Sequence, residues 1–318
     1  MTLPSDVTGA DSAWPLVSVV MPALNAERYI GEALASVFAQ TYERLECLVV
    51  DDGSTDATID VVRGFKDDRP NLLSTGGQRS SAGARNLGCR RSSGALVAFL
   101  DADDLWHPEK LDRQVELFRR RPTLGIAWCG YVITEPDLRP TVEIRPQRRK
   151  RNLESCLLLE ANGVAFSSTG IVSRGALDAV GGFDELLSVS ADVDFAARVV
   201  RHHEADLVTD VLVAYRCHPE QMHLDVVAFE ADMRRILENR VPSAGSRRRG
   251  LANLATRLFF YRFRRDGIRA LKYLLQVGPR IDRPLRLPLE AMGRRTLRWV
   301  RRVRCGIPDP RDWYQGSM

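Results

Sequence analysis

Short apolar stretches alternate with segments of helical periodicity along the first half of the chain. The strand-like stretches are residues 17–21, 45–50, 72–73 and 95–100. Between them, residues 29–40 carry apolar side chains at every third or fourth position, and the segment after Asp56 repeats this spacing at Ile59, Val62 and Phe65. This alternation predicts an α/β fold with a Rossmann-like, mostly parallel sheet flanked by helices.

The pattern loosens after Arg121 and becomes helical further along. We expect strands at residues 125–134, 168–173 and 207–215, helices at residues 153–160 and 195–203, and a basic loop at residues 145–151. From residue 226 onward the pattern is helical, with breaks at residues 242–250 and 279–288. We therefore predict an extended or disordered start at residues 1–14, an α/β domain at residues 15–224 and a basic helical region at residues 225–318.

Composition limits the class of protein. The chain has 318 residues, 44% hydrophobic and 27% charged, which is typical of a folded enzyme and long enough for one large domain with an appendage. No segment reaches the ~18 uninterrupted apolar residues of a membrane span, and residues 1–14 lack a secretory signal pattern, so we expect a cytoplasmic protein. Six scattered cysteines form no C-x-x-C pair, which argues against a zinc site or a disulfide framework.

The charge is distributed unevenly. From Pro242 onward there are 19 Arg or Lys residues against 5 acids, whereas the preceding part has 27 basic against 36 acidic residues. An acidic body argues against nucleic-acid binding. The basic end fits contact with an anionic membrane surface, an acidic acceptor or simply water, and a protein truncated near Ala244 is expected to lose any membrane contact.

Two acidic clusters directly follow predicted strands. Asp51 and Asp52 follow one strand, and Asp101 and Asp103 follow another. Parallel strands bring their carboxyl ends to one edge of the sheet, where ligands bind in such folds. Carboxylates gathered there repel one another unless a cation intervenes, and their hard oxygen atoms suit Mg²⁺ or Mn²⁺. The other interpretation of such acids is that they cap helices and form turns.

Four motifs together resemble a known family. In order along the chain they are Pro22-Ala-Leu-Asn25, Asp51-Asp-Gly-Ser54, Gly83-Ala-Arg-Asn86 and Phe99-Leu-Asp-Ala-Asp-Asp104. Their order and spacing resemble the family 2 glycosyltransferases with the GT-A fold, over about residues 16–218. The resemblance implies that residues 15–224 form a GT-A catalytic domain that binds a nucleotide-diphosphate sugar.

The resemblance also assigns roles to residues at the donor end. Base and ribose contacts would come from Pro22, Ala23, Asn25, Glu27 and Asp52. Arg85 would approach the nucleotide or its phosphates, Asp101 the ribose or the metal, and Asp103 the Mg²⁺ or Mn²⁺ itself. The alternatives are that Asn25 is a turn residue and Arg85 a surface charge on a helix.

A third acidic cluster, Asp192 and Asp194, precedes the predicted helix at residues 195–203. Transfer of a sugar to a hydroxyl needs a group that accepts the proton, and a nearby carboxylate can do so. An E-D pair opens this helix in the resembling family and its Asp is the base, which implies that role for Asp192. The Glu position of the family is Ala191 here. The alternatives are a helix cap for Asp192 and a first-turn acid for Asp194.

Two further segments match the family's site. The loop Gly181-Gly182-Phe183-Asp184 resembles the one that lines the sugar and acceptor pocket; its alternative is a turn with an aromatic core residue. His218, in Tyr215-Arg-Cys-His218, resembles a histidine that approaches the diphosphate or the metal.

These assignments predict an inverting glycosyltransferase. It would move a sugar from a nucleotide-diphosphate donor to a hydroxyl of a glycan, a lipid-linked saccharide or a small molecule. A non-catalytic nucleotide-sugar binder remains an alternative because of Ala191. A nucleotidyltransferase needs a glycine-rich basic loop after the first strand, and residues 22–28 are not such a loop. A haloacid-dehalogenase phosphatase carries D-x-D after its first strand, whereas here the motif follows a later one. A P-loop motif is absent.

Overall fold

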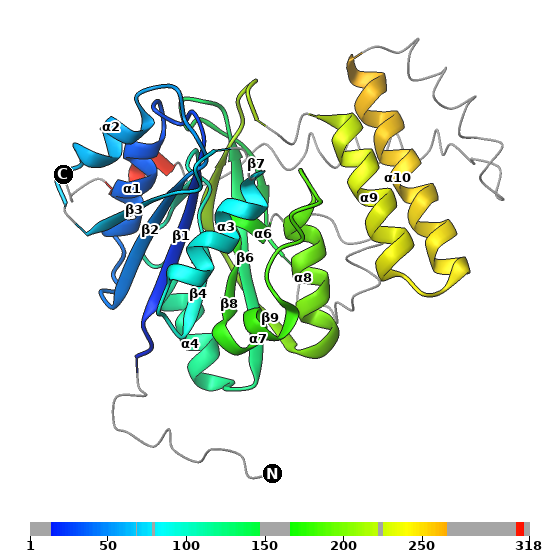
Figure 1. Ribbon diagram of the computed structural model, residues 1–318, viewed down its shortest axis with the longest axis horizontal. Coiled ribbons are helices and arrows are strands. Elements are labelled where there is room, and N and C mark those ends of the chain that lie inside the picture. Colours follow the sequence, from blue (N-terminus) through cyan, green and yellow to red (C-terminus); the bar gives the residue numbers. More distant parts are fainter. Residues whose placement is uncertain are drawn as a thin grey trace.

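A nine-stranded sheet forms the centre of the computed structural model, which describes residues 14–67, 69–77, 80–146, 166–221, 225–265 and 310–314 (Figure 1). Its strands are β1 (Val17–Ala23), β2 (Leu45–Asp51), β3 (Pro70–Ser74), β4 (Leu96–Phe99), β5 (Leu105–Trp106), β6 (Leu124–Thr134), β7 (Pro140–Ile144), β8 (Ile171–Ser173) and β9 (Glu204–Arg216). They lie in the order β3-β2-β1-β4-β8-β6-β9-β5, with β7 paired to β6.

The first half of the sheet is parallel and the second half is mixed. β1 pairs in parallel with β2 and β4, and β2 pairs in parallel with β3. β8 runs antiparallel to both β4 and β6, whereas β6 and β9 are parallel. The α/β fold expected from the alternating pattern is thus confirmed. The carboxyl ends of β1, β2 and β4 share one edge.

Helices cover both faces of the sheet. They are α1 (Ile30–Phe38), α2 (Thr58–Arg63), α3 (Ser80–Arg91), α4 (Lys110–Arg120), α6 (Phe166–Thr169), α7 (Arg174–Val180), α8 (Ala191–His202), α9 (Val226–Arg240), α10 (Ala244–Arg265) and the 3₁₀ helix η4 (Pro310–Tyr314). Alternate strand residues face opposite ways. Val19 packs in a cluster with residues of α1 and α4, and Val20 packs in another with residues of α3, α7 and α8.

Several predicted boundaries differ from the structure. Residues 168–173 are not one strand, because α6 occupies Phe166–Thr169 and only Ile171–Ser173 is extended. The helix predicted at residues 195–203 begins earlier, at Ala191. The first strand continues through Pro22, which lies beyond the end of β4 and pairs only with Val50 of β2. A proline is tolerated there because no neighbouring strand needs its missing N–H.

The predicted break at residues 242–250 is much shorter in the structure. α10 already begins at Ala244 and continues through Gly250. A glycine inside a helix costs about 1 kcal/mol. Burial of Leu254 and Leu258 against the core outweighs this cost. The helix predicted at residues 153–160, residues 147–151 of the basic loop and the break at residues 279–288 lie outside the described residues.

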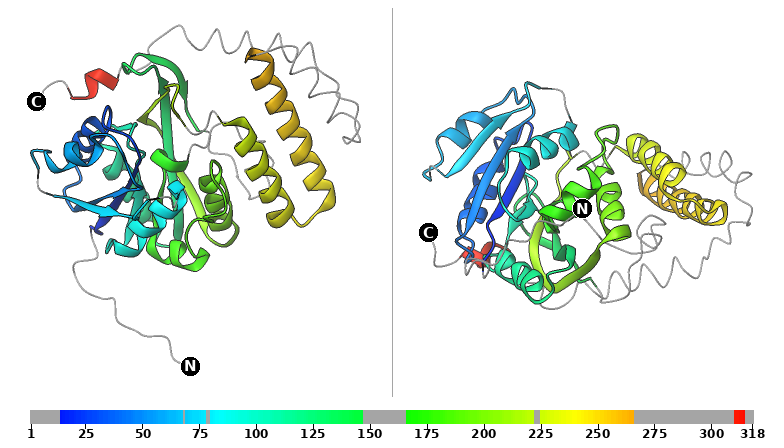
Figure 2. Two further views of the ribbon diagram at one scale, coloured as in Figure 1. Left: turned by 45° about the horizontal axis from the view of Figure 1, so that its top comes forward. Right: turned by 60° about the horizontal axis from the view of Figure 1, so that its bottom comes forward.

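The described C-terminal helices share the core of the α/β part. α9 and α10 lie side by side in every view (Figures 1 and 2). Met233, Ile236 and Leu237 of α9 belong to the same buried cluster as Phe183 and Phe195. The predicted division at residues 224/225 therefore separates segments that pack in one hydrophobic core.

The last described segment returns to the other side of the sheet. Trp313 of η4 packs against the ring of His107, with centroids 5.1 Å apart, and against the small cluster that contains Leu105. None of the helices in the described part of the chain is long and apolar enough to span a membrane. Cys47, Cys89, Cys129 and Cys217 are free thiols.

Candidate active site

The loops that follow β1 and β2 are joined by side-chain hydrogen bonds. Asn25 adopts a positive φ of 50°, a conformation that asparagine tolerates better than most residues. Its carboxamide oxygen accepts the N–H of Thr55 at 2.8 Å. Glu27 likewise accepts the N–H of Ala57 at 2.7 Å. Both predicted donor-binding residues therefore help to shape this edge of the sheet, and Asn25 fulfils the turn alternative as well.

Asp51 and Asp52 have different roles at the end of β2. The carboxylate of Asp51 accepts the N–H groups of Gly53 and Ser54, at 3.1 and 3.2 Å, which is the turn-forming interpretation. Asp52 instead accepts the hydroxyl of Thr75 at 2.6 Å, and its N–H donates to the carbonyl of Ala23 at 2.9 Å. The predicted donor-site residues Ala23 and Asp52 thus lie together, next to Pro22 at the end of β1.

Arg85 and Asp101 form a close ion pair beside the end of β4. The guanidinium of Arg85 lies 2.5 Å from a carboxylate oxygen of Asp101 and 3.3 Å from the hydroxyl of Ser167. Arg85 is only 6% exposed, so the alternative of a surface helix charge is wrong. Burial raises the pKa of Asp101, while Arg85 opposes this shift and neighbouring Asp103 adds to it.

Asp103 and His218 lie together although they are far apart in the sequence. The imidazole Nε2 of His218 is 2.9 Å from a carboxylate oxygen of Asp103, and the side-chain amide of Gln221 donates to the same oxygen at 3.1 Å. Burial tends to raise the pKa of Asp103, but the hydrogen bonds from His218 and Gln221 outweigh it and hold the pKa below its usual value. The other ring nitrogen of His218, Nδ1, is buried and has no partner.

These two side chains fit the predicted cation only in part. Within the described ranges, no group of three or more His, Cys, Asp or Glu residues is arranged to hold a metal ion. Mg²⁺ commonly uses one or two carboxylates and completes its coordination with water and substrate phosphates. Asp103, with the neighbouring imidazole of His218, is a donor set of this kind. The residues therefore fit a cation that binds together with a diphosphate.

Two residues that sequence reasoning missed hold Asp103 in place. Asp104 is fully buried; one of its carboxylate oxygens accepts the hydroxyl of Ser168 and the other accepts the N–H of Arg216 at 3.0 Å. Burial raises the pKa of Asp104 well above its usual value. The side chain of Arg216 donates to the carbonyl of Asp103 at 2.9 Å and pairs with Glu32 at 2.5 Å. The only sequence signal for Arg216 was its place beside His218 in the segment Tyr215-Arg-Cys-His218.

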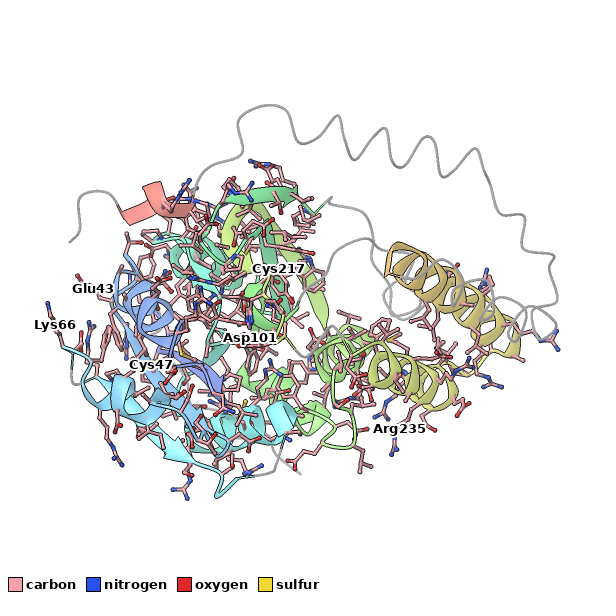
Figure 3. The ribbon with its side chains drawn as sticks, turned by 90° about the horizontal axis from the view of Figure 1, so that it is seen from above. Glu43, Cys47, Lys66, Asp101, Cys217 and Arg235 are labelled. Atoms are coloured by element: carbon pink, nitrogen blue, oxygen red, sulfur yellow. The ribbon has the colours of Figure 1, made fainter. Side chains whose placement is uncertain are left out.

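Asp192 lies in the first turn of α8 and faces the Arg85 cluster. The hydroxyl of Ser167 is 3.4 Å from a carboxylate oxygen of Asp192, and the same hydroxyl contacts Arg85. Burial raises the pKa of Asp192, Arg85 opposes the shift and Asp101 adds to it. Ser190 occupies the cap position of α8, so the helix-cap alternative for Asp192 is wrong. Figure 3 shows Asp101 near the centre of the molecule, between the N-terminal strands and the later green strands.

The loop at residues 181–184 follows α7 and packs beside Arg85. Gly181 and Gly182 both have positive φ, 74° and 79°, and a Cβ at Gly182 would lie 2.6 Å from the carboxamide oxygen of Asn86. Phe183 stacks on Phe195 with centroids 4.3 Å apart, and Asn86 bonds both its N–H and its carbonyl. Phe183 is therefore the aromatic core residue of the alternative interpretation, and a sugar-lining role for the loop stays a prediction.

Comparison with known proteins identifies the family. The sequence model of glycosyl transferase family 2 matches residues 18–181, just over half of the chain. The chain belongs to glycosyl transferase family 2. The matched segment contains Asn25, Asp52, Arg85 and Asp103, and the match ends at Gly181, before α8 and Asp192.

Curated relatives of this family 2 member are glycosyltransferases. An uncharacterized glycosyltransferase of Rickettsia typhi is 28% identical over 65% of this chain and 65% of the relative. The UDP-Glc:α-D-GlcNAc-diphosphoundecaprenol β-1,3-glucosyltransferase WfgD of Escherichia coli is 44% identical over 44% of this chain and 56% of the relative. The chain thus spans less than two thirds of the length of these relatives.

Solved structures confirm the GT-A fold. The mannosyltransferase PcManGT of Pyrobaculum calidifontis, in complex with GDP-Man and Mn²⁺, has a TM-score of 0.61 and 21% identity, over 93% of this chain and 84% of that one. Residues 1–349 of TarS from S. aureus, in complex with UDP, have a TM-score of 0.57 and 20% identity, over 83% of this chain and 77% of that one.

Proposed function

We propose that this protein is an inverting glycosyltransferase that moves a sugar from a nucleotide-diphosphate donor to an acceptor hydroxyl and depends on a divalent cation. The observation that carries this proposal is the convergence of Asp101, Asp103 and Asp192 around Arg85 and His218 at one edge of the sheet. Metal ligation, donor contact and proton transfer need such groups within one site.

The proposed reaction uses the two sides of this cluster differently. Asp103 and His218 would hold Mg²⁺ or Mn²⁺, which supplies positive charge to the leaving diphosphate. Arg85, which is paired with Asp101 in the same cluster, would contact the phosphates. Asp192 takes the proton of the acceptor hydroxyl while the oxygen of that hydroxyl forms a bond with the anomeric carbon. The bond from that carbon to the diphosphate breaks, and nucleoside diphosphate leaves with the bonding electrons. A single displacement of this kind inverts the anomeric configuration.

Names of relatives and neighbours guide the choice of substrates. The Escherichia coli relative is named for UDP-Glc and a diphosphoundecaprenol-linked acceptor, and a Bacillus subtilis relative for teichuronic acid biosynthesis. Structural neighbours hold UDP, UDP-GlcNAc or GDP-Man. We therefore propose a UDP- or GDP-sugar as donor and a lipid-linked or cell-surface saccharide as acceptor.

A donor screen tests the proposed function. The protein is incubated with UDP-, GDP- and dTDP-sugars, with and without Mn²⁺, and the released nucleoside diphosphate is measured. We expect release from at least one donor, abolished by chelator, and a transferred sugar of inverted configuration by NMR. Donor binding without turnover would instead favour the non-catalytic binder that Ala191 suggests. Release of pyrophosphate would favour a nucleotidyltransferase. A retained anomeric configuration would contradict the single displacement.

Peripheral contact with anionic lipid is a further part of the proposal. α10 carries seven arginines and no acidic residue, and Arg248 and Arg249 on it are exposed. Each cation near an anionic surface contributes about 1 kcal/mol. Truncation near Ala244 would remove Leu254 and Leu258 from the core, so exchange of surface charges is the better test.

The variant Arg248→Gln/Arg249→Gln is expected to bind liposomes of anionic lipid about thirtyfold more weakly than the parent, from ~1 kcal/mol per removed cation. Co-sedimentation at low and at physiological salt measures this binding. The matched control is Arg90→Gln/Arg91→Gln, which removes two exposed arginines from α3. Equal binding by both variants and the parent would remove the membrane proposal.

A further inference from the structure

We propose that helix α9 is a positioning element for the acceptor side of the active site, and that Asp232 is its principal anchor. The proposal rests on the function proposed above, because it concerns the base Asp192. α9 lies outside residues 18–181, the segment that matches the family. The family match does not cover α9, so the proposed role is inferred from the contacts of α9 in this structure.

Asp232 holds three consecutive backbone N–H groups at the start of α8. A single carboxylate oxygen of Asp232 accepts the N–H of Ser188 at 2.9 Å, of Val189 at 2.7 Å and of Ser190 at 2.9 Å. Asp232 is 6% exposed, so these bonds form away from water. Hydrogen bonds from N–H groups to a buried carboxylate are about twice as strong as neutral ones. The segment that leads into the first turn of α8 is thus fixed from α9.

Arg240 provides a second link from the end of α9. Its guanidinium donates to a carboxylate oxygen of Asp194 at 2.7 Å and lies 3.3 Å from Asp184. The other oxygen of Asp194 accepts Arg198 at 2.7 Å, and Arg198 also holds the carbonyls of Val180 and Gly182, both at 2.6 Å. The loop at residues 181–184 and the start of α8 are therefore tied to α9 through one buried carboxylate, that of Asp194.

The position of Asp192 depends on these links because, within the described ranges, its carboxylate is hydrogen-bonded outside α8 to one segment alone, at Ser167. Among the described residues, its carboxylate meets another segment at Ser167, whose hydroxyl lies 3.4 Å away and whose backbone N–H also hydrogen-bonds to it. Asp192 is two residues beyond Ser190, so a shift of residues 188–190 moves it directly. A displacement of about 1 Å at a reacting group costs on the order of a hundredfold in rate. The apolar contacts of Met233, Ile236 and Leu237 hold α9 on the core independently of Asp232.

Three variants of the full chain separate anchoring from general stability. Asp232→Ala removes the acceptor oxygen, Asp232→Asn keeps an oxygen acceptor without the charge, and Glu238→Ala removes an exposed acid from the same helix as a control. Amide hydrogen exchange reports the anchoring without any substrate. We expect residues 188–190 to lose protection in Asp232→Ala, to keep most of it in Asp232→Asn, and to be unchanged in Glu238→Ala.

Steady-state kinetics then test the link to the reaction. For Asp232→Ala we expect kcat for transfer to fall about ten- to a hundredfold, with the Kd for donor unchanged and partial recovery in Asp232→Asn. If Asp232→Ala unfolds, Arg240→Gln removes the second link and should show the same separation of kcat from donor Kd.

Two results would overturn the inference: unchanged protection at residues 188–190 in Asp232→Ala, or lost protection with unchanged kcat. A parent protein that releases no nucleoside diphosphate from any donor would overturn the proposed function instead, and the exchange measurement would still decide the anchoring.

Discussion

Asp103→Ala is expected to lower kcat/KM for sugar transfer by about 10²–10³, the usual cost of removing a group that stabilises charge in the transition state. Asp103 supplies the carboxylate next to His218, and no third acid or histidine within the described residues is placed to replace it. Release of nucleoside diphosphate is measured over a range of Mn²⁺ concentrations, so that a weakened metal site appears as a higher metal requirement.

The matched control for this experiment is Asp178→Ala. Asp178 is an exposed acid on α7. It should retain the activity and the metal requirement of the parent. If Asp103→Ala released nucleotide as fast as the parent at the same Mn²⁺ concentration, Asp103 would have no place in the metal site, and the cation-dependent part of the proposal would be abandoned.

Asp192→Asn is expected to lower the transfer rate by about 10²–10⁴, the range for loss of a positioned general base. The amide has nearly the same shape but cannot accept the proton of the acceptor hydroxyl. Donor affinity should change little, because Asp101 forms the ion pair with Arg85 and Asp192 interacts with that guanidinium only at longer range. Calorimetric titration of donor with Mn²⁺ measures that affinity, and a variant with full transfer activity would exclude Asp192 as the base.

The same residue predicts a pH dependence. Burial raises the pKa of Asp192 above its usual value. Only the ionised carboxylate can accept a proton, so transfer should be slow below this raised pKa and increase as the pH passes upward through it. A profile of kcat against pH checks this. The acidic limb should disappear from the residual activity of Asp192→Asn, and an identical limb in that variant would assign the titration to another group.

Sequence reasoning found the strands and the acids at their ends because both signals are local. Apolar runs mark buried strands, and the acids that follow them must lie at the carboxyl edge of a parallel sheet. Asp101 and Asp103 are placed by this rule alone. The approach of His218 to Asp103 came only from the resemblance, since 115 positions separate the two residues.

The supports of the site could not be predicted in this way. Arg216, Ser167 and Asp232 act through contacts with residues 25 to 184 positions away, and no spacing in the sequence indicates such a contact. The break before α10 was predicted, but at residues 242–250 it was predicted too long. Propensity favours a helix that begins only after Gly250, but packing of Leu254 and Leu258 stabilises a helix that begins at Ala244.

The position of Arg85 between two acids affects how substitutions at those acids combine. Its guanidinium pairs with Asp101 and also opposes the rise that burial causes in the pKa of Asp192, so one positive charge acts on both the proposed donor side and the proposed base. Substitutions at these two acids should therefore be epistatic, since removing either carboxylate leaves Arg85 free to act more strongly on the other. A substitution at Asp101 would thus alter the basicity of Asp192 without changing that residue itself.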